Sequence, residues 1–147
     1  MDRMSLFARF AASTLLLGLL IGCGASGPET STVEGTVTLD GQPLAGALLI
    51  FTPQGTAGGR MSGGQTDAQG HYELTYSRDQ MGAVPGEHKI EITTYGQGEG
   101  DEPTPEKLPA KYNTQSELIK TVEPGENTID FELSSEGEIV LPYQGEQ

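Results

Sequence analysis

The stretch "VEGTVTLDGQPLAGALLIFTP", residues 33–53, decides the fold. In its first part Val33, Gly35, Val37 and Leu39 fall on one face, and polar or charged residues fall on the other. This period of two is typical of a half-buried strand. The letters "DGQPLAG" then supply turn residues, and "ALLIFTP" is an apolar run typical of a strand covered on both faces or lying in the centre of a sandwich. The stretch therefore predicts a strand, a turn and a second strand.

The same kind of pattern continues outward along the chain. The segment "GQTDAQGHYELTY" predicts a hairpin with a turn at Asp67 and Gly70, and "EHKIEITTY" predicts a strand. The segment "ELIKTVEPGENTIDFELS" predicts a last hairpin, with Ile129, Phe131 and Leu133 facing inward. Six or seven short strands separated by turns predict an all-β, Greek-key-like β-sandwich of about seven strands.

Composition limits the classes of partner. The chain has 147 residues, room for one domain, and a formal net charge of −13. Without its first 22 residues it keeps 20 acidic and 6 basic residues. This charge repels phosphate backbones and anionic membrane surfaces, so we expect no nucleic-acid partner. A solvated acidic surface explains the charge better than a dedicated cation site.

The N-terminal segment predicts export. The first nine residues contain two basic residues, Arg3 and Arg9, and residues 10–22 are apolar or small throughout. This run is too short to cross a bilayer, which needs about 20 residues, and it is typical of a secretory signal. A single cysteine, Cys23, follows it, so an internal disulfide is impossible. One alternative is that Cys23 is a plain residue in an uncleaved anchor or an ordinary signal peptide.

The letters "LIGC", residues 20–23, resemble the lipobox of bacterial lipoproteins. The resemblance implies cleavage before Cys23, a diacylglyceryl thioether on its sulfur and a further acyl chain, such as palmitate, on the new amino terminus. Two or three acyl chains give stable anchoring at a membrane. Residue 24 is glycine and not aspartate, which resembles outer-membrane sorting if the host is a diderm bacterium. The expected location is the cell envelope.

These observations divide the chain into four parts. Residues 1–22 are the predicted lipoprotein signal peptide, and residues 23–31 are the lipidated cysteine with a small, polar, flexible linker. Residues 32–134 form the predicted sandwich, and residues 135–147 form a C-terminal tail.

Three segments of the predicted sandwich resemble one known family. "VEGTVTLDGQPLAGALLIFTP", "TDAQGHYEL" and "VPGEHKIEI" resemble the carboxypeptidase regulatory-like domain, a small sandwich of the transthyretin-like (prealbumin-like) type, over about residues 32–133. "LPAKYN", residues 108–113, resembles a recurring segment of small exported lipoproteins of planctomycete-like bacteria. In the family a tyrosine often follows the Pro-Gly turn closely, and here His88 stands near that place. The resemblance implies an accessory module and brings no activity with it.

Residue types for catalysis are scarce. The chain has two histidines, His71 and His88, and no recognised nucleophile motif. His88 shares a face with Ile90 and Ile92, which favours a packed or edge-capping histidine, and His71 falls on the polar face of its strand. We therefore predict no catalytic residues and no enzyme activity.

Metal ligands are equally sparse. Two separated histidines and one cysteine cannot supply a usual closed zinc set. The acidic residues Glu99, Asp101, Glu102 and Glu106 lack the spacing of a calcium loop, and a solvated acidic loop is favoured. Whether this loop binds a cation stays open, and no metal or cofactor is predicted.

One exposed segment is a candidate binding surface. Lys111, Tyr112 and Asn113 place a tyrosine beside polar groups, and Tyr95 could stack on sugars from a neighbouring loop. The alternative is that Tyr112 packs over the sandwich edge while the Lys111 stem lies along apolar surface.

Together these inferences predict a lipid-anchored, non-enzymatic β-sandwich module at the cell envelope, with a structural or protein-interaction role. The predicted partners are the membrane, through lipid on Cys23, and an unidentified envelope protein or glycan. An alternative is a carbohydrate- or peptide-binding domain that uses the loops at one end. An exported hydrolase related to transthyretin-like hydrolases is a third hypothesis, but the histidines and arginines that such relatives place around a shared channel find no match here.

Overall fold

The computed structural model describes residues 27–55, 58–96 and 103–141. The predicted signal, Cys23 and the acidic residues Glu99, Asp101 and Glu102 lie outside the described residues. Within the described ranges, no helix is long and apolar enough to span a membrane.

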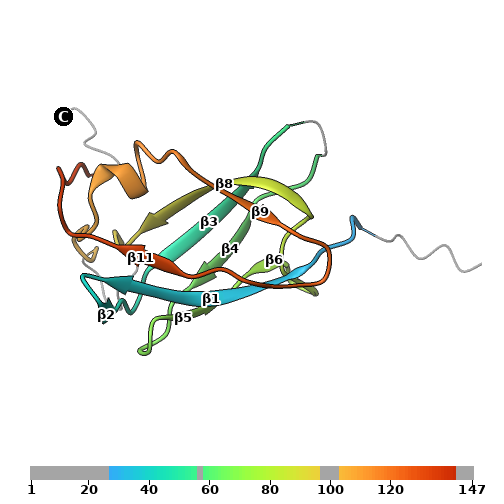
Figure 1. Cartoon of the computed structure of the whole chain (residues 1–147), viewed down its shortest axis with the longest axis horizontal. Coiled ribbons are helices and arrows are strands. Elements are labelled where there is room, and N and C mark those ends of the chain that lie inside the picture. The colour runs from blue at the N-terminus through green and yellow to red at the C-terminus, as the bar shows by residue number, and fades with distance from the viewer. Residues whose placement is uncertain (1–26, 56–57, 97–102, 142–147) are drawn as a thin grey trace, which may run out of the picture.

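Two β-sheets pack face to face, which confirms the predicted all-β sandwich (Figure 1). The first sheet contains β1 (Thr32–Leu39), β2 (Gln42–Pro43), β5 (His71–Glu73), β10 (Glu126–Thr128) and β11 (Phe131–Leu133). The second sheet contains β7 (Gln80–Met81), β6 (Thr75–Ser77), β4 (Ser62–Gln65), β3 (Leu48–Pro53), β8 (Gly86–Thr93) and β9 (Leu118–Val122), in that spatial order. A short 3-10 helix, η1 (Ala110–Tyr112), precedes β9.

Within the described residues the structure divides the strands more finely than the sequence pattern does, into eleven segments. β5 and β6 are separated by Leu74 alone, and β10 and β11 are separated by residues 129–130. If each of these pairs is joined and the two-residue β2 and β7 are set aside, the expected seven strands remain.

The predicted last hairpin is wrong, because its two halves lie in different sheets. β9 pairs antiparallel with β8 in the second sheet, and the chain then crosses over at residues 123–125. β10 and β11 pair parallel with β1 in the first sheet, in one continuous register from Thr32 opposite Glu126 to Leu39 opposite Leu133. The alternation was read correctly, but alternation does not say which strand is the partner.

The hairpin predicted around Asp67 is correct in its turn and only partly correct in its pairing. The Asp67 carboxylate accepts hydrogen bonds from the backbone N–H groups of Gln69 and His71, both at 2.9 Å, and Gly70 has a φ of 76°. β5, however, pairs with β1, and only β6 pairs with β4. The strand passes from one sheet to the other at the buried Leu74, which closes one side of the sandwich.

The core lies between the sheets and is centred on aromatic rings. Phe51 from the second sheet meets Tyr72 and Phe131 from the first, with ring centroids 6.2–6.4 Å apart. Such tilted and edge-on pairs stabilise beyond the area they bury. Of the residues predicted to face inward, Val33, Val37, Phe131 and Leu133 are buried, and Leu39 and Ile129 are partly buried against the same core.

Gly35 allows the last strand to approach β1. A Cβ atom at Gly35 would lie 2.0 Å from the Ile129 carbonyl oxygen, so any side chain here would collide with backbone. The same carbonyl accepts a hydrogen bond from the Tyr72 hydroxyl at 2.7 Å. Burial, with a smaller contribution from Asp130, raises the pKa of Tyr72, so the phenol stays a donor. Gly35 thus lets a buried tyrosine tie β5 to the β10–β11 connection.

Candidate functional site

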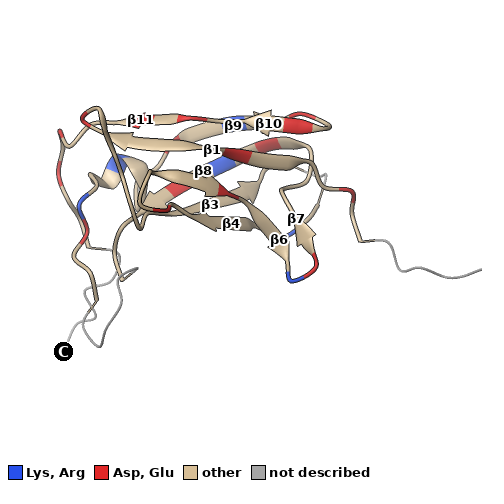
Figure 2. Cartoon of the chain, turned by 90° about the horizontal axis from the view of Figure 1, so that it is seen from below, with Lys and Arg blue, Asp and Glu red and all other residues tan. Residues whose placement is uncertain are grey.

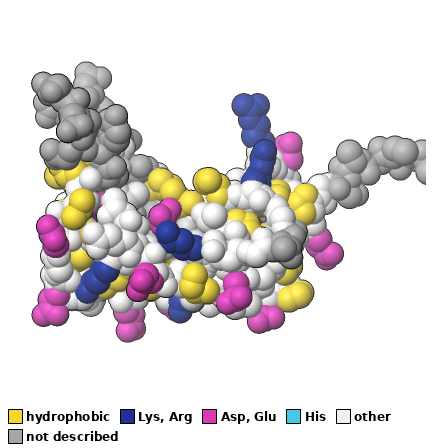
Figure 3. All heavy atoms as spheres, turned by 90° about the horizontal axis from the view of Figure 1, so that it is seen from above, with side chains coloured by type: hydrophobic (Ala, Val, Ile, Leu, Met, Phe, Trp, Pro, Cys, Tyr) yellow, Lys and Arg dark blue, Asp and Glu magenta, His cyan; other side chains and the backbone are white. Residues whose placement is uncertain are grey.

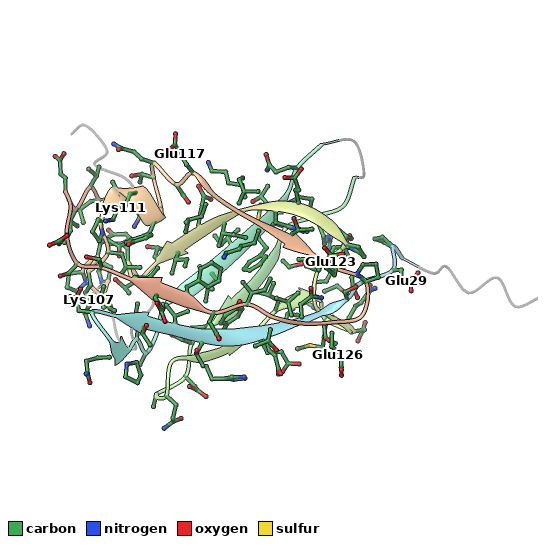
Figure 4. The ribbon with its side chains drawn as sticks, viewed as in Figure 1. Glu29, Lys107, Lys111, Glu117, Glu123 and Glu126 are labelled. Carbon is green, nitrogen blue, oxygen red and sulfur yellow. The ribbon has the colours of Figure 1, made fainter. Side chains whose placement is uncertain are left out.

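The sandwich has two ends with different residues. One end of the sandwich holds residues 28–31, β7 and the 123–125 turn, and we call it the N-terminal end. The opposite end holds η1 and the C-terminal ends of β8 and β11, and we call it the far end. Glu29, Glu123 and Glu126 lie at the first, and Lys107 and Lys111 lie at the second (Figure 4). The four residues predicted as a binding surface all lie at the far end, because Tyr95 follows β8 and residues 111–113 form and follow η1.

A buried carboxylate organises the far end. Glu106 is 6 % exposed and accepts hydrogen bonds from the Thr93 hydroxyl and from both the N–H and the hydroxyl of Thr94, at 3.0 and 2.8 Å. The backbone N–H groups of Lys107 and Leu108 donate to the same Oε1 atom at 3.0 Å each. Five donors therefore converge on one side chain and join the end of β8 to the segment that leads into η1.

The environment of Glu106 keeps it ionised. Burial alone would raise the pKa of this carboxyl, but the hydrogen bonds from Thr93, Leu108 and Thr94 outweigh burial and lower it below its usual value. The prediction of a solvated acidic loop is therefore wrong for Glu106. Its acceptor positions are used by the protein itself, which makes it a structural group.

Asn113 continues this polar framework. Its side chain is 5 % exposed, and its amide nitrogen lies 3.4 Å from the Ile92 carbonyl and 3.5 Å from the Leu108 carbonyl. The amide oxygen accepts a hydrogen bond from the Thr114 N–H at 2.8 Å. Asn113 thus shapes the end of η1 and offers little side-chain surface to a ligand.

Lys111 and Tyr112 lie on η1, and the structure brings them together. The Lys111 ammonium lies 5.1 Å from the centre of the Tyr112 ring, within range of a cation–π contact. Tyr112 is half-buried against the core, and its hydroxyl accepts a hydrogen bond from the Ser134 N–H at 3.0 Å. Tyr95, also half-buried, follows β8, and its N–H donates to the Thr93 hydroxyl. Lys111 is the most open of the four predicted residues.

A shallow recess of about 160 Å³ lies beside this segment on the outer face of the second sheet. Ile50, Glu91 and Thr93 form its floor, and Asn113 and Thr114 form one side. Its size suits a single small group, such as one side chain or part of one sugar ring, and it is far smaller than a typical small-molecule site.

A second hollow, of about 340 Å³, lies on the first sheet toward the N-terminal end. Glu34, Glu73 and Glu126 line it together with Asn127 and neighbouring backbone. Glu34 and Glu73 stand directly opposite each other on β1 and β5, an unfavourable placement for like charges. No group of three or more His, Cys, Asp or Glu side chains in the described part of the chain is arranged to hold a metal ion.

The two histidines occupy contrasting places. His71 is exposed, with its Nε2 atom 3.9 Å from Glu34. His88 is 1 % exposed, lies 6.0 Å from Phe51 ring to ring, and donates from Nδ1 to the Gly86 carbonyl at 3.0 Å. Its Nε2 atom has no hydrogen-bond partner among the described residues. The interpretation of His88 as a packed histidine is therefore confirmed.

Sequence reasoning missed Glu106 as the organising residue. Four acids stand close together in residues 99–106, and nothing in their spacing marks one as buried. The pair Thr93–Thr94 supplies three of its donors, but these threonines lie more than ten residues away and read only as the end of a strand. No local signal could have joined the two segments.

The fold and this end surface define a β-sandwich with a polar, loop-built end. A scan of protein-family models gives no match, and a search of curated proteins gives none either. Among solved structures, a DUF3823 family protein from Parabacteroides merdae is similar at 16 % identity and a TM-score of 0.41, over 73 % of this chain and 47 % of that one. The chain thus spans about half the length of that protein.

A second solved structure is the dioxygenase domain of a dioxygenase carbohydrate-binding protein fusion from the cellulolytic bacterium Streptomyces sp. SirexAA-E. It is similar at 24 % identity and a TM-score of 0.38, over 76 % of this chain and 83 % of that one. At these TM-scores neither likeness carries an argument about what this chain binds or does.

Proposed function

We propose that the protein is a lipid-anchored, non-enzymatic β-sandwich module of the bacterial cell envelope, of the carboxypeptidase regulatory-like type, with a structural or protein-interaction role. The observation that carries the proposal is Cys23, the single cysteine, placed directly after a short apolar run and before a small, polar segment. Acylation at this position would hold the protein by its N-terminus.

The two ends of the sandwich support this arrangement. The chain enters the domain at the N-terminal end, where β1 begins, and β1 then runs to the far end, where it pairs with Leu133. A protein anchored through Cys23 would hold its N-terminal end toward the membrane and present its far end, with η1, to the surroundings. That end is rigidly built around Glu106, as a recognition surface requires.

The test is to express the full-length protein in a diderm bacterium, extract the membranes and measure the mass of the N-terminal peptide. We expect a diacylated or triacylated Cys23 at the mature N-terminus, and we expect Cys23→Ala to leave an unprocessed, unacylated precursor. In-cell cross-linking of the wild-type protein should recover a recurrent envelope partner. An unmodified Cys23 in the exported protein would refute the anchored module.

The placement of Tyr95, Lys111 and Tyr112 at one end favours a second function, binding of an envelope glycan or peptide. The exposed Lys111 ammonium lies 5.1 Å from the centre of the Tyr112 ring, and tyrosine is enriched at binding surfaces because its apolar ring carries a polar hydroxyl. Calorimetric titration with envelope polysaccharides tests it, with Lys111→Ala as the variant and Lys89→Ala, on β8, as the control. Binding that Lys111→Ala weakens and Lys89→Ala does not would support this function, and no heat of binding would count against it.

A further inference from the structure

The N-terminal end carries an exposed patch of methionine and arginine side chains. We call Arg60, Met61, Arg78 and Met81 the Met–Arg corner. Met61 is 60 % exposed and Met81 is 43 % exposed, and both arginines are exposed as well. Figure 3 shows basic side chains projecting next to hydrophobic ones on this part of the surface, close to where the N-terminal trace leaves. Apolar side chains beside basic ones are the combination that protein segments lying on a membrane surface use.

Tyr76 joins the two halves of this corner. Its hydroxyl accepts a hydrogen bond from the Arg60 N–H at 3.3 Å, and the Arg60 guanidinium lies 6.0 Å from the centre of its ring. Met81 belongs to β7, and the Thr75 hydroxyl lies 3.7 Å from its sulfur. The loop before β4 and the β6–β7 hairpin are therefore held side by side.

The segment that leads back to Cys23 is bound to this same hairpin. The Thr30 hydroxyl donates to the Met81 carbonyl at 2.8 Å, and the Gln80 amide donates to the Pro28 carbonyl at 2.8 Å. Ser31 and Ala83 exchange backbone hydrogen bonds of 2.8 and 3.0 Å. Residues 28–31 were predicted as part of a flexible linker, but they are fixed to β7 and its flank.

This attachment shortens the reach of the anchor. Only five residue steps separate Cys23 from Pro28, which span at most about 18 Å when fully extended. A lipidated Cys23 lies at the boundary between acyl chains and headgroups, and the headgroup layer is itself about 5–8 Å thick on each side. The N-terminal end of the domain must then lie within roughly 10 Å of the bilayer surface.

The two sides of the N-terminal end differ in charge. Glu123 and Glu126 lie on the β10 side, and the β6–β7 hairpin, whose turn holds both Arg78 and Asp79, lies on the opposite side (Figure 2). Lipid phosphates attract guanidinium groups and repel carboxylates. The net charge of the whole chain disfavours an anionic surface, but at the Met–Arg corner Arg60 and Arg78 balance Asp79 and the neighbouring Glu29, so this side is the less acidic of the two.

From these observations we infer that the Met–Arg corner docks on the phospholipid surface to which Cys23 is anchored. The arginines bind lipid phosphates, and Met61 and Met81 enter the headgroup layer. The inference rests on the proposed lipid anchor. A weak contact suffices, because the short tether holds the corner at a high effective concentration beside the bilayer. Docking fixes the orientation of the domain and keeps the far end directed away from the membrane.

Methionine oxidation measures this contact without adding a label. Met61 and Met81 are the only methionines that follow Cys23 in the chain. The lipidated protein is reconstituted in vesicles of phosphatidylethanolamine and phosphatidylglycerol and treated with a hydrophilic oxidant. Mass spectrometry then follows sulfoxide formation at each methionine and the acylation of Cys23 in the same sample.

The decisive variant is Arg78→Glu, and its matched control is Lys107→Glu at the far end. Both side chains are exposed, neither shows a side-chain hydrogen bond or ion pair among the described residues, and both substitutions change the net charge equally. We expect Arg78→Glu to speed the oxidation of Met61 and Met81 several-fold on vesicles and Lys107→Glu to leave it unchanged. Thermal unfolding of both variants checks that the fold is retained.

Three results separate the two proposals. An acylated Cys23 with oxidation rates that depend on Arg78 and not on Lys107 supports docking. An acylated Cys23 with the same rates in all three proteins overturns docking and leaves the lipid anchor standing. An unmodified Cys23 overturns both.

Discussion

In the middle of the sandwich, Phe51, Tyr72 and Phe131 fill the space between the sheets, whereas at the far end the single carboxylate of Glu106 gathers five donors. The middle is stabilised by apolar burial, which is spread over many contacts. The far end is stabilised by directed hydrogen bonds to one charge, and such a network fails as a unit when one member is changed. Damage to the middle should therefore unfold the domain, and damage at the far end should open it locally.

The largest effect is expected from Phe131→Ala. Phe131 is buried against Phe51 and Tyr72, so its loss leaves a cavity between the sheets. Substitutions of this kind lower the free energy of unfolding by about 3–5 kcal/mol, a large part of the stability of a small domain. Urea unfolding measures the loss. Val37→Ala, in the same core, should also destabilise, and unchanged midpoints for both variants would contradict the strand register.

Gly35→Ala should have a smaller but still global effect. The added methyl group would overlap the Ile129 carbonyl oxygen, so β1 and the β10–β11 connection must separate and the Tyr72 hydrogen bond must lengthen. Overpacking of this kind typically destabilises by about 1–3 kcal/mol. Gly63→Ala is the control, because the nearest atom to its Cβ would lie at an ordinary 3.6 Å. Equal thermal midpoints for the two variants would show that the close approach at Gly35 is unimportant.

The comparison also explains what the sequence could predict. The alternation of Val33, Gly35 and Val37, and the turn at Asp67, are local signals, and both were predicted correctly. The parallel pairing of β10 and β11 with β1 joins residues about 90 positions apart in the chain. The burial of Glu106 depends on threonines about a dozen positions away. Periodicity gives the face of a strand but not its neighbour, and one carboxylate among several carries no mark of burial.

A weaker and local effect is expected from Glu106→Gln. Glutamine offers one acceptor oxygen in place of two and turns two N–H donors toward a cluster of donors. The hydrogen bonds that remain unmade should lower stability by about 1–3 kcal/mol, mainly at the far end. Hydrogen exchange should accelerate at the amides of Thr94, Lys107 and Leu108, which donate to this carboxylate.

The exposed Glu117 provides the control for this variant, since Glu117→Gln makes the same chemical change outside the cluster. It should leave exchange at the three amides unchanged. If Glu106→Gln accelerated exchange equally in β1 and β3, the far end would not open independently, and the division between a middle and an end would fail.

The smallest effect is expected from acid, which should lower the stability of the middle through protonation of His88. Burial lowers the pKa of His88, although the bond to Gly86 opposes the shift. A second proton would sit on the buried Nε2, near the Phe51 ring, and Lys120 stands directly opposite on β9 and adds a like charge. On β8 the neighbouring charges of Glu87 and Lys89 fall on the outer face. The unfolded chain therefore binds this proton more readily than the folded domain.

Stability should consequently be complete above about pH 6.5, the value for an unfolded histidine, and fall by roughly 1 kcal/mol per pH unit as the pH drops toward the lowered pKa of the folded state. Glu106, whose pKa is also lowered, loses its contribution only at lower pH, below the usual value of 4.5. His88→Phe removes the first step and should make the free energy of unfolding independent of pH just below pH 6.5, while His71→Gln should leave the His88 step in place. His88 packs against Phe51, and its Nε2 has no hydrogen-bond partner among the described residues. If the first step survived in His88→Phe, the loss of stability in acid would come from a group other than His88.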